Sequence, residues 1–246
     1  MTVFVTSSPF IDGADRAILS EANGFVDRIR EALPENPNVV FVASNPEDHR
    51  GTCEFAAITT AAFAEKGIHF GSYQILSDQT AGRAYALVSH SDLLVLCGGH
   101  VPTQNAFFRK IRLRHQMNKY QGVVLGISAG SMNMAQEVYS QPEEPGESAP
   151  EFPRFLPGLG LTWVNILPHC QKARYYTIDG KRLYEDVTFA DSMGRTFFAL
   201  PDGSYFLQEE DRLLLCGESY RIRDGIMEML TLQGECLDME YLYRFI

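Results

Sequence analysis

The sequence predicts an α/β fold: a three-layer sandwich with helices on both faces of a mostly parallel central sheet, and added β-hairpins near the C-terminus. Three observations support this predicted fold. Nearly continuous apolar runs of strand length alternate with helix-length segments over the first two thirds of the chain, as in parallel strands buried on both faces. Glycines follow several of these runs. After residue 195, short strand-like runs are joined by Pro201-Asp202-Gly203 and Asp224-Gly225, which predict hairpin turns.

Apolar runs of strand length are followed in turn by segments with helix signals. Predicted strands cover residues 3–6, 38–42, 69–76, 93–96 and 122–126. Predicted helices cover residues 23–33 (with Asn23 as a candidate cap), 48–66, 79–89, 103–118 and 131–138. Residues 140–158 are acidic and rich in proline, which predicts a loop, with a solvated linker as its plainest interpretation.

Length and composition limit the classes of function. The 246 residues suit one domain spanning 1–246, and 45% hydrophobic residues can build a sizeable core. The net charge of -10, without a basic stripe, disfavours nucleic acid and anionic membranes as partners. Five scattered cysteines predict neither a disulfide framework nor a structural metal site. No signal peptide or 18-residue apolar run is present, so we expect a cytoplasmic monomer or homodimer without a cofactor.

The candidate nucleophile is Ser128, within the sequence GISAG at residues 126–130. A serine between two glycines, after a buried strand and before a helix, predicts a nucleophile elbow. The N–H of Ala129 would then point to a forming oxyanion. The glycine pair Gly98-Gly99 ends the preceding strand and is a source of a second donor. An ordinary glycine-rich turn with a capping serine is the alternative.

A serine nucleophile needs a base, and a base needs an orienting acid. His169 is the one histidine after Ser128, so it is the candidate base under the order nucleophile, acid, histidine. That order confines the acid to five glutamates that the residues alone do not rank. They are Glu137, Glu143, Glu144, Glu147 and Glu151.

Four motifs carry a resemblance to a known family: LCGG at 96–99, GISAG at 126–130, LPH at 167–169 and LPDGS at 200–204. Together they resemble peptidase family S51, which contains aspartyl dipeptidase (peptidase E) and cyanophycinase, with most likeness to a bacterial branch. These are serine hydrolases on the class I glutamine amidotransferase-like fold. The resemblance implies Ser128 as nucleophile, His169 as base, and Gly99 and Ala129 as oxyanion donors.

The resemblance also implies an acid and a substrate class. Ungapped comparison places the family's acid on Glu143, where Glu replaces Asp, and Glu144 stands next to it. The segment after the glycine pair, with His100 and Gln104 where dipeptidases carry Asn, would line the substrate pocket. The substrate would be a short peptide with an acidic group read by a cation. Candidate cations follow the base: Lys172, Arg174 and Arg182.

Two other functions share these features. An α/β-hydrolase esterase also has a GxSxG elbow, but its histidine usually lies close to the C-terminus, and 77 residues follow His169 here (246 − 169). A domain on the same fold that binds a small molecule or peptide without catalysis would keep the pocket and lose the reaction. The distance between the Ser128 hydroxyl and the His169 ring distinguishes catalysis from binding.

Overall fold

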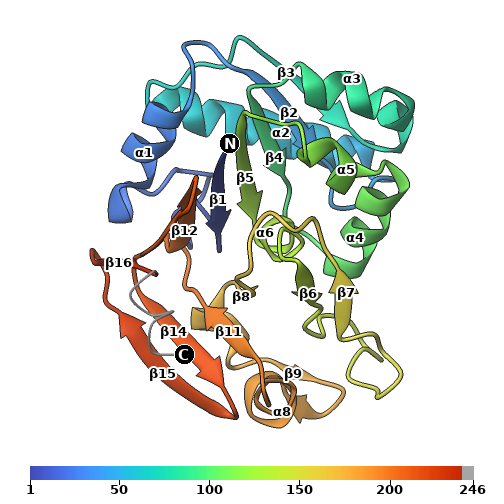
Figure 1. Cartoon of the computed structure of the whole chain (residues 1–246), viewed down its shortest axis with the longest axis vertical. Coiled ribbons are helices and arrows are strands. Elements are labelled where there is room, and N and C mark those ends of the chain that lie inside the picture. The colour runs from blue at the N-terminus through green and yellow to red at the C-terminus, as the bar shows by residue number, and fades with distance from the viewer. Residues whose placement is uncertain (240–246) are drawn as a thin grey trace.

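The computed structural model describes residues 1–239 and contains a large central sheet flanked by helices (Figure 1). Its eight strands run in the order β16-β13-β12-β1-β5-β4-β2-β3. Five of them are parallel: β1 (Thr2–Thr6), β2 (Asn38–Val42), β3 (Ser72–Leu76), β4 (Leu93–Leu96) and β5 (Val123–Ile127). The predicted α/β fold with a mostly parallel sheet is confirmed.

Alternating side chains along the strands bury both faces of this sheet, because successive residues of a strand point to opposite faces. On β2, Val40 and Val42 pack with α3 (Ala84–Ser89), α4 (Val101–Lys110) and α5 (Leu113–Met117). Val39 and Phe41 instead pack with α1 (Phe25–Ala32) and α2 (His49–Glu65). The sheet is therefore the middle layer of three.

The C-terminal part extends the sheet at one edge. Strand β12 (Tyr205–Glu209) pairs antiparallel with β1, β13 (Arg212–Cys216) pairs with β12, and β16 (Cys236–Asp238) pairs with β13. The β12–β13 hairpin turns at residues 210–211. The predicted hairpin turn Pro201-Asp202-Gly203 is wrong: it links β11 (Thr196–Ala199), a strand of another sheet, to β12, and the two strands do not pair.

A second, four-stranded sheet lies below the carboxyl ends of the central strands in the view of Figure 1. Its order is β15-β14-β11-β8, with β8 (Ile166–Leu167), β11 (Thr196–Ala199), β14 (Ser219–Arg223) and β15 (Ile226–Thr231). It packs with α7 (Cys170–Ala173) and with the helical segment formed by η3 (Leu183–Thr188) and α8 (Phe189–Asp191). The hairpin of β9 (Thr177–Ile178) and β10 (Lys181–Arg182) lies between α7 and η3. The turn at residues 224–225 joins β14 to β15 as a hairpin of this second sheet, so the hairpin predicted there is confirmed.

The predicted helix over residues 131–138 is wrong. Helix α6 (Ala129–Met132) is one turn long, and β6 (Glu137–Tyr139) follows and pairs with β7 (Phe155–Pro157). The carbonyl of Asn133 accepts the N–H of Leu159, and that of Met134 accepts the N–H of Leu161. These tertiary hydrogen bonds use the groups that a continuing helix would need.

Three further helix predictions differ from the structure in detail. The helix over residues 103–118 is two helices, because Arg112 between them adopts φ 53°. Asn23 does not cap α1: it has φ 58° within η1 (Ala22–Gly24), and its side chain donates to the carbonyl of Gly203. The helix over 79–89 begins as the tighter turn η2 (Asp78–Arg83).

No helix in residues 1–239 is long and apolar enough to cross a membrane.

Candidate active site

The site lies where parallel strands end, because their carboxyl ends meet at one edge of the sheet. Ser7 follows β1, Ser44 lies just beyond β2, the glycine pair 98–99 follows β4, and Ser128 follows β5. A Cβ atom at Gly98 would lie 3.4 Å from the Cβ of Ser128. The glycine pair and the serine are therefore neighbours, as their sequence positions predicted.

Ser128 has the strained backbone that an elbow requires, with φ 52° and ψ −115°. A non-glycine residue in such a region costs about 1–3 kcal/mol, which the surrounding structure must supply. Its N–H is held by the carbonyls of Thr6 at 3.2 Å and Ser7 at 2.9 Å. A side chain at Gly130 would overlap the carbonyl oxygen of Leu96, so the second glycine permits the tight turn.

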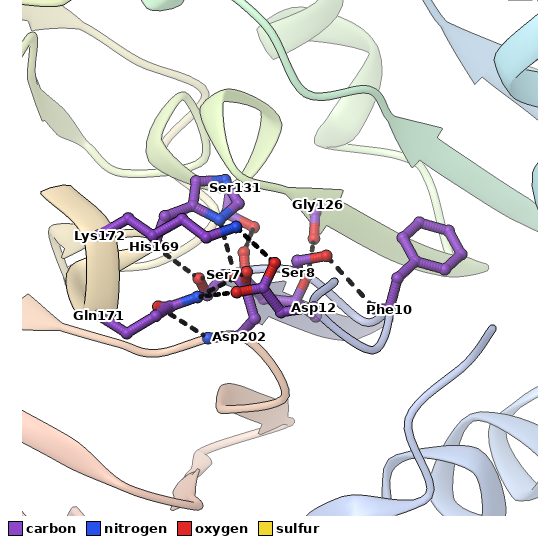
Figure 2. Close-up of polar contacts among 11 residues, drawn as sticks. Ser7, Ser8, Phe10, Asp12, Gly126, Ser131, His169, Gln171, Lys172 and Asp202 are labelled. Carbon is purple, nitrogen blue, oxygen red and sulfur yellow. Dashed lines mark hydrogen bonds and ion pairs between the residues drawn. The ribbon is translucent and has the colours of Figure 1, made fainter. Parts of the chain in front are cut away.

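His169 and Asp202 come together through the second sheet. Strands β8 and β11 are parallel, with Leu167 opposite Ala199. His169 lies two residues beyond one strand and Asp202 three residues beyond the other. The Nδ1 atom of His169 lies 2.7 Å from Oδ1 of Asp202 (Figure 2). A carboxylate on Nδ1 fixes the ring orientation and the tautomer in which Nε2 is free to accept a proton.

Ser7 joins this pair to the central sheet. Its Oγ donates to Oδ1 of Asp202 at 2.8 Å and accepts the backbone N–H of His169 at 2.8 Å (Figure 2). Its carbonyl also accepts the N–H of Ser128. One residue at the end of β1 thus contacts all three members of the Ser128, His169 and Asp202 set. Within the described chain no hydrogen bond joins the Ser128 hydroxyl to His169.

Asp202 stays ionised despite its burial. Its side chain is 9% exposed, and burial raises the pKa of a carboxyl group. Hydrogen bonds from His169 and Ser7, the charge of His169, and a bond from Gln171 Nε2 to Oδ2 at 2.8 Å outweigh that effect. The net result is a pKa below the ordinary value.

The carboxylate on His169 is therefore not one of the predicted glutamates. The sequence prediction placed Glu143 there, with Glu144 or Glu147 as substitutes, because it assumed that the acid precedes the histidine. Here the acid on Nδ1 follows it, so the chain order is Ser128, His169, Asp202. Asp202 is the central residue of the LPDGS motif.

Glu147 binds the other histidine of the site. Its Oε1 lies 2.8 Å from Nε2 of His100, and its Oε2 accepts the backbone N–H groups of Glu143 and Glu144. His100 Nδ1 lies 2.8 Å from Oγ1 of Thr103. Burial raises the pKa of Glu147, but the hydrogen bonds lower it by a larger amount, so the net shift of the pKa is downward. Residues 143–147 are thus attached beside the glycine pair and are not a free linker.

Glu143 lies near both histidines, whose charges influence its pKa. Its side chain is open to solvent, yet dense surroundings raise its pKa to about 7. The nearby charges of His100 and His169 lower the pKa, whereas those of Glu147 and Glu144 raise it. Since the side chain is accessible, the raised pKa carries no argument about stability.

The predicted oxyanion donors belong to the glycine pair beside Ser128 and to the residue that follows Ser128. Gly99 has φ 152°, and a side chain there would overlap Oγ of Ser44. Its N–H has no acceptor within residues 1–239. Ala129 is the first residue of α6, so its N–H has no partner within the helix. Both predicted donors are free to bind a ligand.

Gln104, predicted to line the substrate pocket, is a structural brace. It is completely buried. Its Nε2 donates to the carbonyl of Cys97 at 2.7 Å, and its Oε1 accepts from Asn133 at 3.1 Å. With both ends of the amide engaged, it has no group left for a substrate. It supports the strand end that carries the glycine pair.

The three candidate cations differ in whether a carboxylate already neutralises their charge. Lys172 pairs with Asp12 (Figure 2), and Arg182 makes a bidentate pair with Asp186. Arg174 has no carboxylate partner within residues 1–239; its guanidinium lies 5.1 Å from the centroid of the Tyr175 ring. Its Nε is buried without an acceptor. Arg174 is therefore the one of the three whose charge is not already neutralised.

One group in residues 1–239 has side chains that could hold a metal ion. Ligand atoms of His100, Glu144 and Glu147 lie within 4.8 Å of one another. The carboxylate of Glu147 already accepts three hydrogen bonds, and the second nitrogen of His100 contacts Thr103. The hydrogen bonds account for the cluster without an ion.

Together, the fold and the site define an α/β protein with the residue types of a Ser-His-Asp hydrolase at its sheet edge. No protein-family model matches the chain, and no curated protein matches it in sequence. Among solved structures, a peptidase from an acI-B1 actinobacterium is similar with a TM-score of 0.63, 16% identity and 96% of each chain covered. A candidate peptidase E protein from Listeria monocytogenes EGD-e has a TM-score of 0.57 and 13% identity, over 94% of this chain and 98% of that one. At these identities the likeness establishes the shared fold.

Proposed function

We propose that the protein is a serine peptidase of the peptidase E type that hydrolyses short peptides, with Ser128 as nucleophile, His169 as base and Asp202 as its orienting acid. The observation that carries the proposal is the connection through Ser7 of a strained serine and a paired His–Asp. The structural likeness to two proteins named as peptidases supports the reaction class.

In the proposed reaction, the contact between Asp202 and His169 orients the base. Asp202 accepts the Nδ1 proton of His169, so Nε2 accepts the hydroxyl proton as Ser128 Oγ attacks the peptide carbonyl. The N–H groups of Gly99 and Ala129 stabilise the oxyanion, each contributing about 2.7–4 kcal/mol. His169 then protonates the leaving amine as the C–N bond breaks. Water, deprotonated by His169, releases the acyl group from Ser128. In unliganded enzymes the nucleophile–base hydrogen bond is often long and shortens when substrate binds.

In this proposal Glu143 and Arg174 contact the substrate rather than the base. Glu143 is accessible, and its pKa responds to the charges of both His100 and His169. A carboxylate there suits the free amino group of a short peptide, and the unpaired Arg174 suits an acidic group through charge-assisted hydrogen bonds. His100 and Glu144, on either side of the Glu147 carboxylate, would shape the same pocket.

A fluorophosphonate probe followed by mass spectrometry tests the nucleophile directly. We expect the folded wild type to be labelled on Ser128, whereas Ser128→Ala should take up no label and His169→Ala should react far more slowly. Ser131→Ala is the matched control, since Ser131 lies on the same turn but donates to the carbonyl of Thr6. An unlabelled, correctly folded wild type would overturn the proposal.

A dipeptide library then separates peptidase from binding domain. We expect hydrolysis that disappears in Ser128→Ala, with dipeptides that carry an N-terminal acidic residue among the best substrates. If the dipeptides raise the Tm equally in both proteins and neither cleaves them, the site is a binding site and the catalytic assignment is wrong.

A further inference from the structure

Two cysteines lie directly opposite each other on the last two strands of the central sheet, outside the proposed catalytic set. Cys216 ends β13 and Cys236 begins β16, and the two are partners in the antiparallel ladder. Directly opposed residues have Cα atoms about 4.5–5.5 Å apart and side chains on the same face of the sheet. Disulfides need Cα separations of about 4.4–6.8 Å. The ladder therefore places the two residues within reach of a covalent bond.

One guanidinium group donates hydrogen bonds to both sulfur atoms. Arg28 on α1 donates from Nη1 to Sγ of Cys216 at 2.8 Å and from Nη2 to Sγ of Cys236 at 3.3 Å. A cation beside a thiol stabilises the thiolate, which is the reactive form. The backbone is fixed at the same place, since Gly217 N–H donates to the carbonyl of Glu235 at 2.8 Å.

The two thiols differ in access. Cys216 is completely buried, whereas Cys236 is exposed. Burial raises the pKa of the Cys216 thiol to about 12, and the adjacent Cys236 raises it as well, against the lowering effect of Arg28. A dissolved oxidant therefore reaches Cys236 first, and Cys216 is placed behind it as a resolving thiol.

We propose that Cys216 and Cys236 form a reversible redox pair that a peroxide converts to a cross-strand disulfide. The Cys236 thiolate attacks one oxygen of hydrogen peroxide and forms a sulfenic acid, with release of one water after proton transfer. The Cys216 sulfur then displaces the hydroxyl group from the Cys236 sulfur, and a second water leaves. The two thiols lose two electrons and two protons, and one peroxide becomes two waters. A dithiol reverses the step by exchange.

The bond would enclose residues 217–235, which contain β14 and β15. Strand β14 pairs with β11, and β11 pairs with β8, the strand that leads to His169. Oxidation would therefore covalently join the two ends of the β14–β15 hairpin, which pairs with β11 in the sheet that carries His169.

The test uses the full-length protein, reduced and then treated with a few equivalents of hydrogen peroxide. After alkylation of free thiols, digestion and mass spectrometry should show one cross-linked peptide pair joining Cys216 to Cys236, lost again on treatment with dithiothreitol. The Tm of the oxidised protein should rise by about 5–10 °C, because the link removes freedom from the unfolded chain. Cys53→Ser, at a half-buried cysteine outside the pair, should behave as wild type.

Two variants keep the proposal falsifiable. Cys236→Ser changes only the exposed member and should abolish both the cross-link and the Tm rise. Arg28→Gln should retain the cross-link but slow its formation several-fold. If peroxide instead carries Cys236 of the folded wild type to sulfinic acid, or links it to a second molecule, while Cys216 stays alkylatable, the proposal is wrong.

Discussion

The substitution Asp202→Asn tests the unexpected member of the site. The carboxylate accepts three side-chain hydrogen bonds: Oδ1 from His169 and Ser7, and Oδ2 from Gln171. An amide has one acceptor oxygen, so each of its two orientations places NH₂ at one of these sites, either against His169 and Ser7 or against the Gln171 amide. With NH₂ toward His169, the proton of the ring moves to Nε2, and the ring can no longer accept the proton of Ser128.

The expected loss in rate is large. In a Ser-His-Asp set, the wrong tautomer lowers kcat by about 10⁴, which corresponds to about 5 kcal/mol at 1.36 kcal/mol per tenfold. The stability loss should be smaller, about 1–3 kcal/mol, because the fold loses charge-assisted hydrogen bonds but keeps the packing. A catalytic loss that exceeds the stability loss is the signature of an orienting residue.

The assay compares kcat on the best dipeptide with urea unfolding for wild type, Asp202→Asn, Glu143→Gln and one control variant. Asp12→Asn is the matched control, because the same change there removes a surface partner of Lys172. We expect a deep loss of kcat in Asp202→Asn alone. If Asp202→Asn keeps kcat within threefold of wild type while Glu143→Gln loses several decades, the glutamate is the orienting acid and our interpretation of the geometry fails.

Three further substitutions probe the surroundings of this pair. Glu143→Gln should alter the pH dependence of substrate binding rather than of stability: with a raised pKa of about 7, the accessible carboxylate should lower KM as pH rises through about 7, the variant should lose that dependence, and an identical KM profile in both proteins would contradict this. Ser7→Ala should cost about 1–3 kcal/mol in urea unfolding and lower kcat, because it leaves the partly buried N–H of His169 without an acceptor; an unchanged kcat would show that Ser7 is only structural. Gly130→Ala should cost about 1–3 kcal/mol by overpacking against Leu96, and an unchanged midpoint in urea would mean that the turn can open.

The parallel half of the fold was predictable because each of its strands is a local signal. Residues such as 38–42 and 93–96 are apolar on both faces, and the intervening helices have clear ends. The failures came where long-range contacts decide the structure. Residues 131–138 have helix-compatible composition, yet hydrogen bonds to Leu159 and Leu161 divert the backbone after one turn. Nothing within that window indicates those partners.

The residues of the candidate site also fall into those with a local sequence signal and one that depends on a long-range contact. Ser128, His169, Gly99 and Ala129 were found because each lies at the end of an apolar run that the sequence displays. Their catalytic roles remain predictions. Asp202 was missed because a rule of chain order restricted the search to residues before His169. The signal was present, since the LPDGS motif follows a strand-like run just as LPH does. What the sequence lacked was the pairing of β8 with β11.

That pairing has a consequence for how the site is assembled. Ser128 and the glycine pair are fixed to the large sheet, whereas His169 and Asp202 are delivered by the small one as a preformed unit. The hydroxyl of Ser7, at the end of a strand of the large sheet, connects the two halves through its hydrogen bonds with Asp202 and His169. A slight slide of one sheet past the other would change the distance between nucleophile and base while both halves stayed intact. Alignment between the two sheets, more than the presence of the three side chains, would then decide whether such a molecule is active.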